Sequence, residues 1–341
     1  MPYTEHYELS IQRQFGKSTV LTVGYVGTQG HRLLTSVEAN PGNAPLCLSL
    51  NNPAAVAPGT PTCGPNLEGT TFTTASGQTI NGTRTILGPN FGSNPYTKTE
   101  ANSNYNSLQT SVRYSGKYAS FLLGYTYSKC FDNASGLQDT TDPFNPALSR
   151  ALCAFDLTQN FVGSYTVTLP FDRLVAPNSW ARWVVGGWSL SGITTFATGQ
   201  PVTLSENDDQ SLLGVQFATV DLPECSAGPI LLNTNPRRLD ASGNPIPYFN
   251  TSLFTQEPLG QIGNCKRRFF HGPGINNWNI ALQKDTKLTE SVALVFRAEA
   301  YNVFNHAQFN NPNGLWNSST FGIVNSARDP RIMQMALKLV F

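Results

Sequence analysis

The sequence predicts an all-β protein: an antiparallel up-and-down transmembrane β-barrel, present as a partial barrel of about nine to ten strands with long extracellular loops. Three observations predict it. Apolar and polar residues alternate in segments of about ten residues, short and long connections alternate between these segments, and charged residues are scarce. Charged residues make up 13% of the chain, about half of the roughly 25% that is typical of soluble domains.

The alternation is clearest at the C-terminus, in "RIMQMALKLVF". Successive side chains of a strand leave opposite faces, so this segment has one apolar and one mixed face. A soluble sandwich would bury the apolar face against a second sheet, whereas an outer-membrane barrel would turn it toward lipid. The apolar face would carry Met333, Met335, Leu337, Leu339 and Phe341, and the mixed face Gln334, Ala336 and Lys338.

Nine segments are predicted as strands, and their length suits the roughly 9 to 11 residues of a tilted strand that crosses a bilayer. No uninterrupted apolar run approaches the roughly 20 residues of a transmembrane helix. The predicted strands are residues 7–14, 19–28, 105–114, 118–129, 158–169, 185–197, 276–284, 292–303 and 332–341.

The connections alternate in length. Every second connection of an up-and-down sheet lies at the same end, so the short links would share one end and the long ones the other, as in outer-membrane proteins with short periplasmic turns and long extracellular loops. The short links are residues 15–18, 115–117, 170–184 and 285–291, and the long ones are 29–104, 130–157, 198–275 and 304–331.

Aromatic residues lie near the predicted strand ends, as interfacial girdles would. A group at the periplasmic rim would comprise Phe171, Trp180, Trp183, Trp188 and Phe341, and an outer group Tyr25, Tyr125 and Tyr127. The alternative is that they are ordinary core aromatics.

All six cysteines fall in the predicted long connections, two in each of three loops. Six cysteines allow fifteen pairings. The pairing that keeps each bridge within its own loop joins Cys47 to Cys63, Cys130 to Cys153, and Cys225 to Cys265, and we expect it on a face exposed to an oxidising exterior. Free buried cysteine and metal binding are the alternatives, but the chain has no Cys-x-x-Cys.

Other motifs give no catalytic, cofactor or metal residue. "GWSLSG" at residues 187–192 resembles a nucleophile elbow, but Ser191 stands where a glycine is required and the motif lies inside a predicted strand. The acidic "ENDDQ" at residues 206–210 could bind calcium, but it lacks the regular oxygen spacing and the glycine of a dedicated calcium loop, so we expect a solvated acidic turn. The formal net charge of +1 does not favour a nucleic-acid partner.

Polar side chains of the last two predicted strands are candidates for the barrel lumen. They are Arg297, Glu299, Tyr301 and Lys338. Structural pairing across the lumen and contact with a transported ligand both remain open for them.

Several segments together resemble the C-terminal barrel of bacterial TonB-dependent outer-membrane receptors, specifically the subgroup with an N-terminal carboxypeptidase-regulatory-like domain. The segments are "VLTVGYVGTQGHRL" (20–33), "SNYNSLQTSVRYSGKYASFLLGYTYSK" (103–129), "GWSLSGITTFATGQPVTL" (187–204), "RFFHGPGINNWNIALQKDTKLTE" (268–290), "FRAEAYNVFNHAQF" (296–309) and "FGIVNSARDPRIMQMALKLVF" (321–341).

The resemblance implies a roughly 22-stranded barrel plugged by an N-terminal domain and energised by a periplasmic TonB partner. It also implies that Phe341 is the C-terminal signal for the barrel assembly machinery. The sequence shows no plug, TonB box or leader, so we expect residues 1–341 to be the C-terminal part of a single barrel domain. Its partners would be outer-membrane lipid, the N-terminal plug and barrel portion, and TonB through that portion. Alone, this part should transport nothing.

The expected function is nutrient uptake across the outer membrane as part of the full receptor, with no catalysis. One alternative is a secreted carbohydrate-binding β-sandwich or other binding module whose apolar faces pack inside. Another is a small outer-membrane barrel enzyme, for which the sequence offers no polar catalytic cluster.

Overall fold

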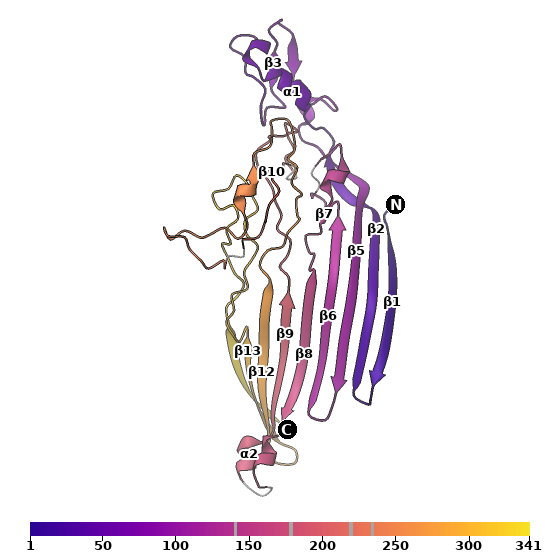
Figure 1. The fold of residues 1–341 in the computed structure, drawn as a ribbon, viewed down its shortest axis with the longest axis vertical. Coiled ribbons are helices and arrows are strands. Elements are labelled where there is room, and N and C mark those ends of the chain that lie inside the picture. Colours follow the sequence, from indigo (N-terminus) through magenta and orange to yellow (C-terminus); the bar gives the residue numbers. More distant parts are fainter. Residues whose placement is uncertain (140–141, 177–179, 218–220, 233–234) are drawn as a thin grey trace.

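The computed structural model describes residues 1–139, 142–176, 180–217, 221–232 and 235–341. One large antiparallel sheet dominates it, with the strand order β1-β2-β5-β6-β8-β9-β12-β13-β14, and the short strand β7 pairs with β6 off this path (Figure 1). Each long strand therefore lies beside the next long strand along the chain, which confirms the predicted up-and-down order.

The long strands begin and end near the predicted residues. They are β1 (Tyr3–Phe15), β2 (Thr19–Glu38), β5 (Pro95–Ser115), β6 (Ala119–Asp132), β8 (Gln159–Leu169), β9 (Trp188–Ala197), β12 (Ile275–Lys287), β13 (Ala293–Tyr301) and β14 (Ile332–Val340).

The register sorts side chains by polarity, because residues directly opposite each other on neighbouring strands share a face. A row across one face is apolar and aromatic, and the adjacent row on the other face is mostly hydroxyl and amide. The first runs Met333, Ala300, Ile280, Gly192, Tyr165, Phe121 and Tyr114, and the second runs Gln334, Glu299, Ala281, Ser191, Thr166, Ser120 and Ser115.

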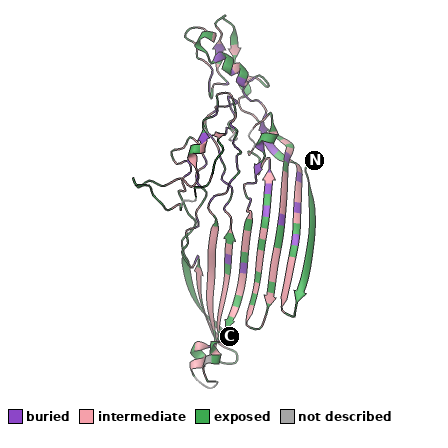
Figure 2. Ribbon diagram, viewed as in Figure 1, coloured by how far each residue is buried: buried purple, intermediate pink, exposed green. Residues whose placement is uncertain are grey.

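Large apolar side chains stay exposed on the first face. Leu337 is 67% exposed and Leu339 51%. The two further sheets among the described residues, β3–β4 and β10–β11, have two strands each and belong to the loops. Figure 2 shows that the buried residues gather mainly at the loop end rather than along the sheet. The sandwich alternative, which requires a covering sheet over this face, is therefore wrong.

The connections are sorted as predicted. The short links lie at one end together with the C-terminus, and the long loops rise from the other end (Figure 1). At the short-link end Trp180 and Trp183 are 81% and 58% exposed. Lys284 donates from Nζ to the carbonyls of Trp183 and Gly186 at 2.7 and 2.8 Å, which keeps its charge at this rim.

Helices are few and short. None among the described residues is long and apolar enough to cross a membrane. Asn43 caps the longer one, because its side chain accepts from the Leu46 amide at 3.0 Å. The helices are α1 (Ala44–Leu50) and α2 (Ala181–Val185), with 3₁₀ turns η1 (Pro53–Ala55), η2 (Pro89–Phe91), η3 (Pro146–Ser149), η4 (Phe171–Leu174) and η5 (Thr251–Leu253); the short strands are β3 (Thr71–Thr73), β4 (Thr79–Asn81), β7 (Ala151–Leu152), β10 (Glu224–Cys225) and β11 (Phe254–Thr255).

Strands β2 and β5 are about twice as long as predicted. They continue past the membrane-length segment as a paired stalk, and the register shifts between Gly30 and Leu33, where Arg32 has a φ of 53°. A bulge of this kind bends and twists a hairpin. The apolar alternation stops at the bulge, which is why the pattern predicted loops at residues 29–104.

Glycines on the apolar face make room for aromatic rings. A Cβ on Gly192 would lie 2.5 Å from the hydroxyl of Tyr165, the residue opposite it on β8. The tyrosine ring thus covers the exposed backbone of the glycine, an arrangement that stabilises β-strands containing glycine.

The buried hydrophobic core lies in the long loops. One cluster comprises Val202, Leu204, Leu222, Phe249, Phe254, Cys265, Phe270 and Phe321. The other comprises Ala44, Cys47, Leu50, Val56, Cys63, Phe72 and Leu212. We call the folded long loops together the loop layer.

The disulfides join Cys47 to Cys63, Cys130 to Cys153, and Cys225 to Cys265, the three pairs that the loop positions predict. The expectation that no cysteine lies in a strand is wrong. Cys130 lies in β6, because this strand runs beyond the apolar segment into the loop layer. Cys225 lies in β10, a two-residue strand that pairs with β11 within the loop layer.

Candidate functional site: the polar face and the loop layer above it

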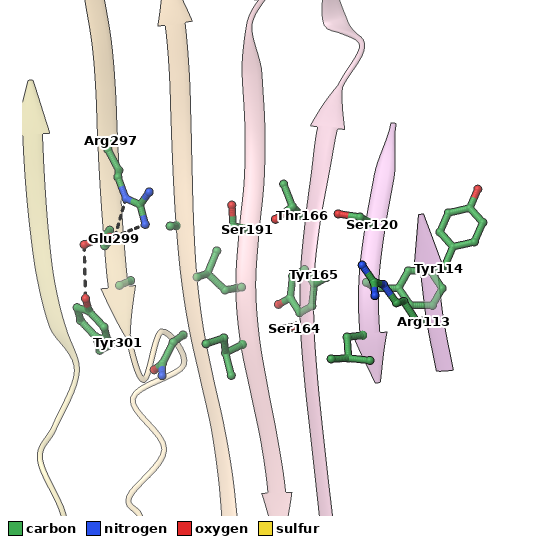
Figure 3. Close-up of a pocket in the computed structure, with 18 of the residues that line it drawn as sticks. Arg113, Tyr114, Ser120, Ser164, Tyr165, Thr166, Ser191, Arg297, Glu299 and Tyr301 are labelled. Atoms are coloured by element: carbon green, nitrogen blue, oxygen red, sulfur yellow. Dashed lines mark hydrogen bonds and ion pairs between the residues drawn. The ribbon is translucent and has the colours of Figure 1, made fainter. Parts of the chain in front are cut away.

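The polar face of the sheet is hollowed into a trough of about 810 Å³ that spans strands β5 to β13 (Figure 3). The face is mixed, because small hydroxyl and amide side chains lie beside Leu122 and Ile193 along the same rows. The polar lining includes Arg113, Ser120, Ser164, Thr166, Ser191, Asn279, Arg297, Glu299 and Tyr301.

Arg297 and Glu299 form an ion pair in the trough, with Arg297 Nη2 2.6 Å from Glu299 Oε1. Arg297 Nη1 also donates to Gln283 Oε1 of β12 at 3.4 Å. Glu299 Oε2 accepts from Tyr301 at 3.5 Å and from Gln334 of β14. The group ties three strands together, so these two charges already have protein partners.

The other predicted residues of the last strand lie apart from this group. The register places Lys338 opposite Val295, on the same polar face as Arg297 but nearer the short-link end. Phe341 is 92% exposed at that end. A role for Phe341 in assembly and a lumenal role for Lys338 remain predictions.

Ser191 lies in the middle of β9, opposite Thr166 and Ala281. A nucleophile elbow needs a sharp turn from strand to helix. The hydroxyl is therefore one of a row of lumenal hydroxyls, which suits hydrogen bonding rather than nucleophilic attack.

Two adjacent arginines join the loop that follows β6 to the loop that follows β9. Arg267 Nη2 lies 2.8 Å from Asp132 Oδ1, and both side chains are 3% exposed. Arg267 and Arg268 both contact Asp139. Burial opposes the charge on Asp139, but the two guanidinium groups hold the pKa of that carboxyl below its usual range.

A second polar link supports the same junction. Asp156 Oδ2 lies 2.9 Å from His271 Nε2, and Asp156 Oδ1 accepts from the Cys130 amide at 2.7 Å. Burial alone would raise the pKa of Asp156, yet the contacts with His271 and the amide lower it.

The expectation of a solvated acidic turn at residues 206–210 is wrong. Glu206 is 2% exposed and Asp209 7%, because loop segments from both sides enclose the turn. Burial and the neighbouring carboxyl of Glu257 raise the pKa of Glu206 to about 9. Burial also raises the pKa of Asp221, which contributes a backbone carbonyl to Glu206, to about 7.

A further buried carboxyl lies where the first and third long loops meet. Glu68 Oε2 is 3.9 Å from Arg84 Nη2. Burial and the neighbouring Asp209 raise the pKa of Glu68 to about 8, and Arg84 offsets only part of this.

The sequence reasoning missed the charged groups of the loop layer. Arg267 and Arg268 form a doublet in a chain with few charges, and that doublet was an available signal for a buried network. No comparable signal joined Glu257 to Glu206, which lies far earlier in the chain and meets it only through packing of the loops.

A family model described as "Outer membrane beta barrel domain" matches residues 1–334. The outer membrane transporter YddB from Escherichia coli has 10% identity and a TM-score of 0.49, over 99% of this chain and 32% of that one. The ferric citrate transporter FecA in the unliganded form has 10% identity and a TM-score of 0.40, over 99% and 31%.

The chain thus spans about a third of the length of these two transporters. No curated protein matches it. The family model covers nearly the whole sheet and the loop layer, and the lipid-facing and lumen-facing rows agree with it. The chain belongs to the outer membrane beta barrel domain family.

Proposed function

We propose that the chain is the C-terminal part of a TonB-dependent outer-membrane receptor that takes up a scarce nutrient. The observation that carries this proposal is the structure of the sheet. One face is apolar and exposed, and the other carries the trough and the polar rows. All long loops lie at one end of the strands. This arrangement is typical of barrels with a lipid-facing exterior, a polar lumen and extracellular loops.

The proposed division of the domain has a physical reason. β1 and β14 each pair with one neighbour within the described chain, and unpaired backbone groups in hydrocarbon cost several kcal/mol each. We propose that further strands complete the barrel and that a plug domain fills its lumen. TonB would act through that plug, and the barrel assembly machinery would insert the whole.

In this proposal the trough lies against the plug or along the ligand path. Rows of hydroxyls and amides, together with the paired Arg297 and Glu299, offer hydrogen bonds without a large net charge. Such a wall suits a polar ligand that must pass without being held tightly. Recognition would come from the loop layer, where loops on a rigid scaffold supply binding groups.

Disruption of the gene in its own host tests the function. We expect energy-dependent accumulation of one class among ferric chelates, oligosaccharides and peptides to be lost, and a protonophore to abolish the same uptake in the undisrupted strain. Normal accumulation of every class, or uptake that survives the protonophore, would contradict the proposal.

The reading frame upstream of Met1 tests the proposed domain division separately. We expect it to encode a plug domain and the remaining strands in frame. An unrelated gene that ends in a stop codon before Met1 would contradict the division.

A further inference from the structure

Three carboxylates of one long loop converge inside the loop layer. One carboxylate oxygen from each of Glu206, Asp208 and Glu257 lies within 4.8 Å of the others. Glu206 and Glu257 are each 2% exposed. Carboxylates are almost never fully buried unless they are paired or bind a metal, so their convergence here needs an explanation.

Most of the oxygens in this cluster lack a protein partner. Gln256 donates from Nε2 to Glu206 Oε1 and to Asp208 Oδ2, both at 3.1 Å. The buried oxygens Glu206 Oε2, Asp208 Oδ1 and both carboxylate oxygens of Glu257 accept no hydrogen bond from the described residues. These unpartnered oxygens are the ligand atoms that a bound cation would use.

No basic side chain compensates the cluster. Within the described part of the chain, no Lys, Arg or His nitrogen comes within 4.0 Å of a carboxylate oxygen of these three residues. The arginine doublet points to Asp132 and Asp139 instead. No basic side chain of the described residues therefore neutralises the charge that these three carboxyls carry when they are ionised.

The surrounding fold holds the three carboxylates in place. Glu224 pairs with Thr255 in the β10–β11 ladder, two residues before Glu257, and the Cys225–Cys265 disulfide anchors the same ladder. The backbone before Glu206 is fixed by the hydrogen bond from the Trp316 amide to the Ser205 carbonyl at 2.9 Å. Ligands on such supported segments need little reordering to bind an ion.

The donor chemistry selects the kind of cation. All three ligands are carboxylates, and hard oxygen donors suit Ca²⁺, Mg²⁺ or Mn²⁺ rather than the softer metals that prefer thiolate or imidazole. Ca²⁺ accepts irregular geometry and mono- or bidentate carboxylates, whereas Mg²⁺ demands a near-ideal octahedron. A site assembled from loop segments fits Ca²⁺ better.

We propose that Glu206, Asp208 and Glu257 bind a calcium ion on the extracellular side, where the ion holds residues 206–208 against the segment after β11. Calcium sites in extracellular modules have dissociation constants of about 10⁻⁴–10⁻³ M. Calcium would therefore join these two segments of the loop layer at extracellular calcium concentrations, and they would separate more readily where calcium is scarce.

Terbium(III) luminescence tests the site in the intact receptor, purified in detergent micelles together with the rest of its barrel. Terbium replaces Ca²⁺ on oxygen ligands, and Trp316, which lies beside Ser205, would sensitise its emission. We expect saturable emission that Ca²⁺ displaces at a concentration at least tenfold below that of Mg²⁺. No saturable emission, or displacement by Mg²⁺ at the same concentration as Ca²⁺, would overturn the proposal.

Matched variants locate the ion. Glu257→Gln should weaken terbium binding at least tenfold, while Asp329→Asn, an exposed acid in another extracellular loop, should leave it unchanged. If Glu257→Gln does not give the heat-modifiable gel mobility of a folded barrel, Asp208→Asn replaces it, because Asp208 is only half-buried. Equal affinity in the folded variant and in Asp329→Asn would overturn the assignment.

Discussion

The sheet and the loop layer differ in where their apolar side chains lie: exposed along the sheet and buried in the loop layer. Along the sheet, Leu337 and Met335 are 67% and 72% exposed, and the charges on its polar face lie in an open trough. In the loop layer, Phe249 is fully buried and three disulfides and buried ion pairs hold the segments. A protein that is surrounded by water alone would bury its large apolar side chains in both regions.

The difference shows where each part obtains its stability. Lipid covers the apolar face of the strands, so the sheet needs no protein core of its own. Its stability comes from the hydrogen bonds between the backbones of neighbouring strands. The loop layer stands in water and must bury apolar surface to hold its shape. Phe249 shows this, because its ring meets those of Phe254, Phe270 and Phe321 at centroid distances of 5.6, 5.0 and 5.0 Å.

The largest expected effect belongs to the arginine network of the loop layer. Arg267→Met leaves Asp132 buried without its closest ion-pair partner, with only the more distant Arg268 and a hydrogen bond from Ser135, which should cost about 3–5 kcal/mol. Hydrogen exchange should rise in residues 133–158 and 198–274 while the β1–β2 hairpin stays protected. Loss of protection throughout the sheet would show that the two regions do not fold independently.

A charge placed on the lipid face comes next. Met335→Arg should destabilise the inserted sheet by about 2–4 kcal/mol, because arginine is costly near the bilayer midplane. Its neighbour Gln334→Arg, at nearly the same depth on the polar face and opposite Glu299, should cost little. Urea unfolding in lipid vesicles measures both, and equal losses would contradict the assignment of the faces.

A change of one pH unit should have a smaller effect than either substitution, on the order of 1.4 kcal/mol, and this effect is confined to the loop layer. Glu68 has a pKa raised to about 8 in the folded loop layer, so its contribution to stability is present at acid pH and is lost as pH rises from about 4.5 to about 8. The linked free energy is on the order of 1.4 kcal/mol for each pKa unit between the folded and unfolded states.

Hydrogen exchange of residues 39–94 should therefore speed up across that pH range, beyond the intrinsic dependence of exchange. Glu68→Gln should remove the excess, because the amide does not titrate. An excess that persists in the variant would assign the effect to another group.

The smallest effect is expected at the short-link end. Arg182 Nη2 lies 3.1 Å from Asp172 Oδ2, but both side chains are about 40% exposed, and exposed pairs contribute about 0–1 kcal/mol. Arg182→Ala should leave the urea midpoint nearly unchanged. A loss as large as that of Met335→Arg would mean that this rim stabilises the barrel far more than its exposure indicates.

The sheet could be predicted from the sequence, and the loop layer could not. The alternation of Met333, Met335 and Leu337 with Gln334 and Ala336 is local information, because lipid and lumen impose the same period on every strand. The loop lengths then fixed the order of the strands. The disulfides of the loop layer are the exception, because three of the long loops hold two cysteines each and the pairs could be predicted from that.

The loop layer depends on contacts between distant segments that no local period encodes. Leu212 enters the cluster around Cys47 and Cys63 from another loop, and Glu257 meets Glu206 only after both segments pack. The acidic turn at residues 206–210 was predicted to be solvated for this reason, since the sequence alone shows its charge but not the segments that enclose it.

The central claim is that lipid covers the apolar face of the sheet. Because all six cysteines of this chain are disulfide-bonded, none of them competes for a nitroxide attached through Leu337→Cys or Lys338→Cys in the intact receptor reconstituted into vesicles. We predict frequent collisions of the Leu337 label with oxygen and few with a water-soluble nickel chelate, and the reverse for Lys338. A label at position 337 that is shielded from both reagents, as under a second protein layer, would contradict the account.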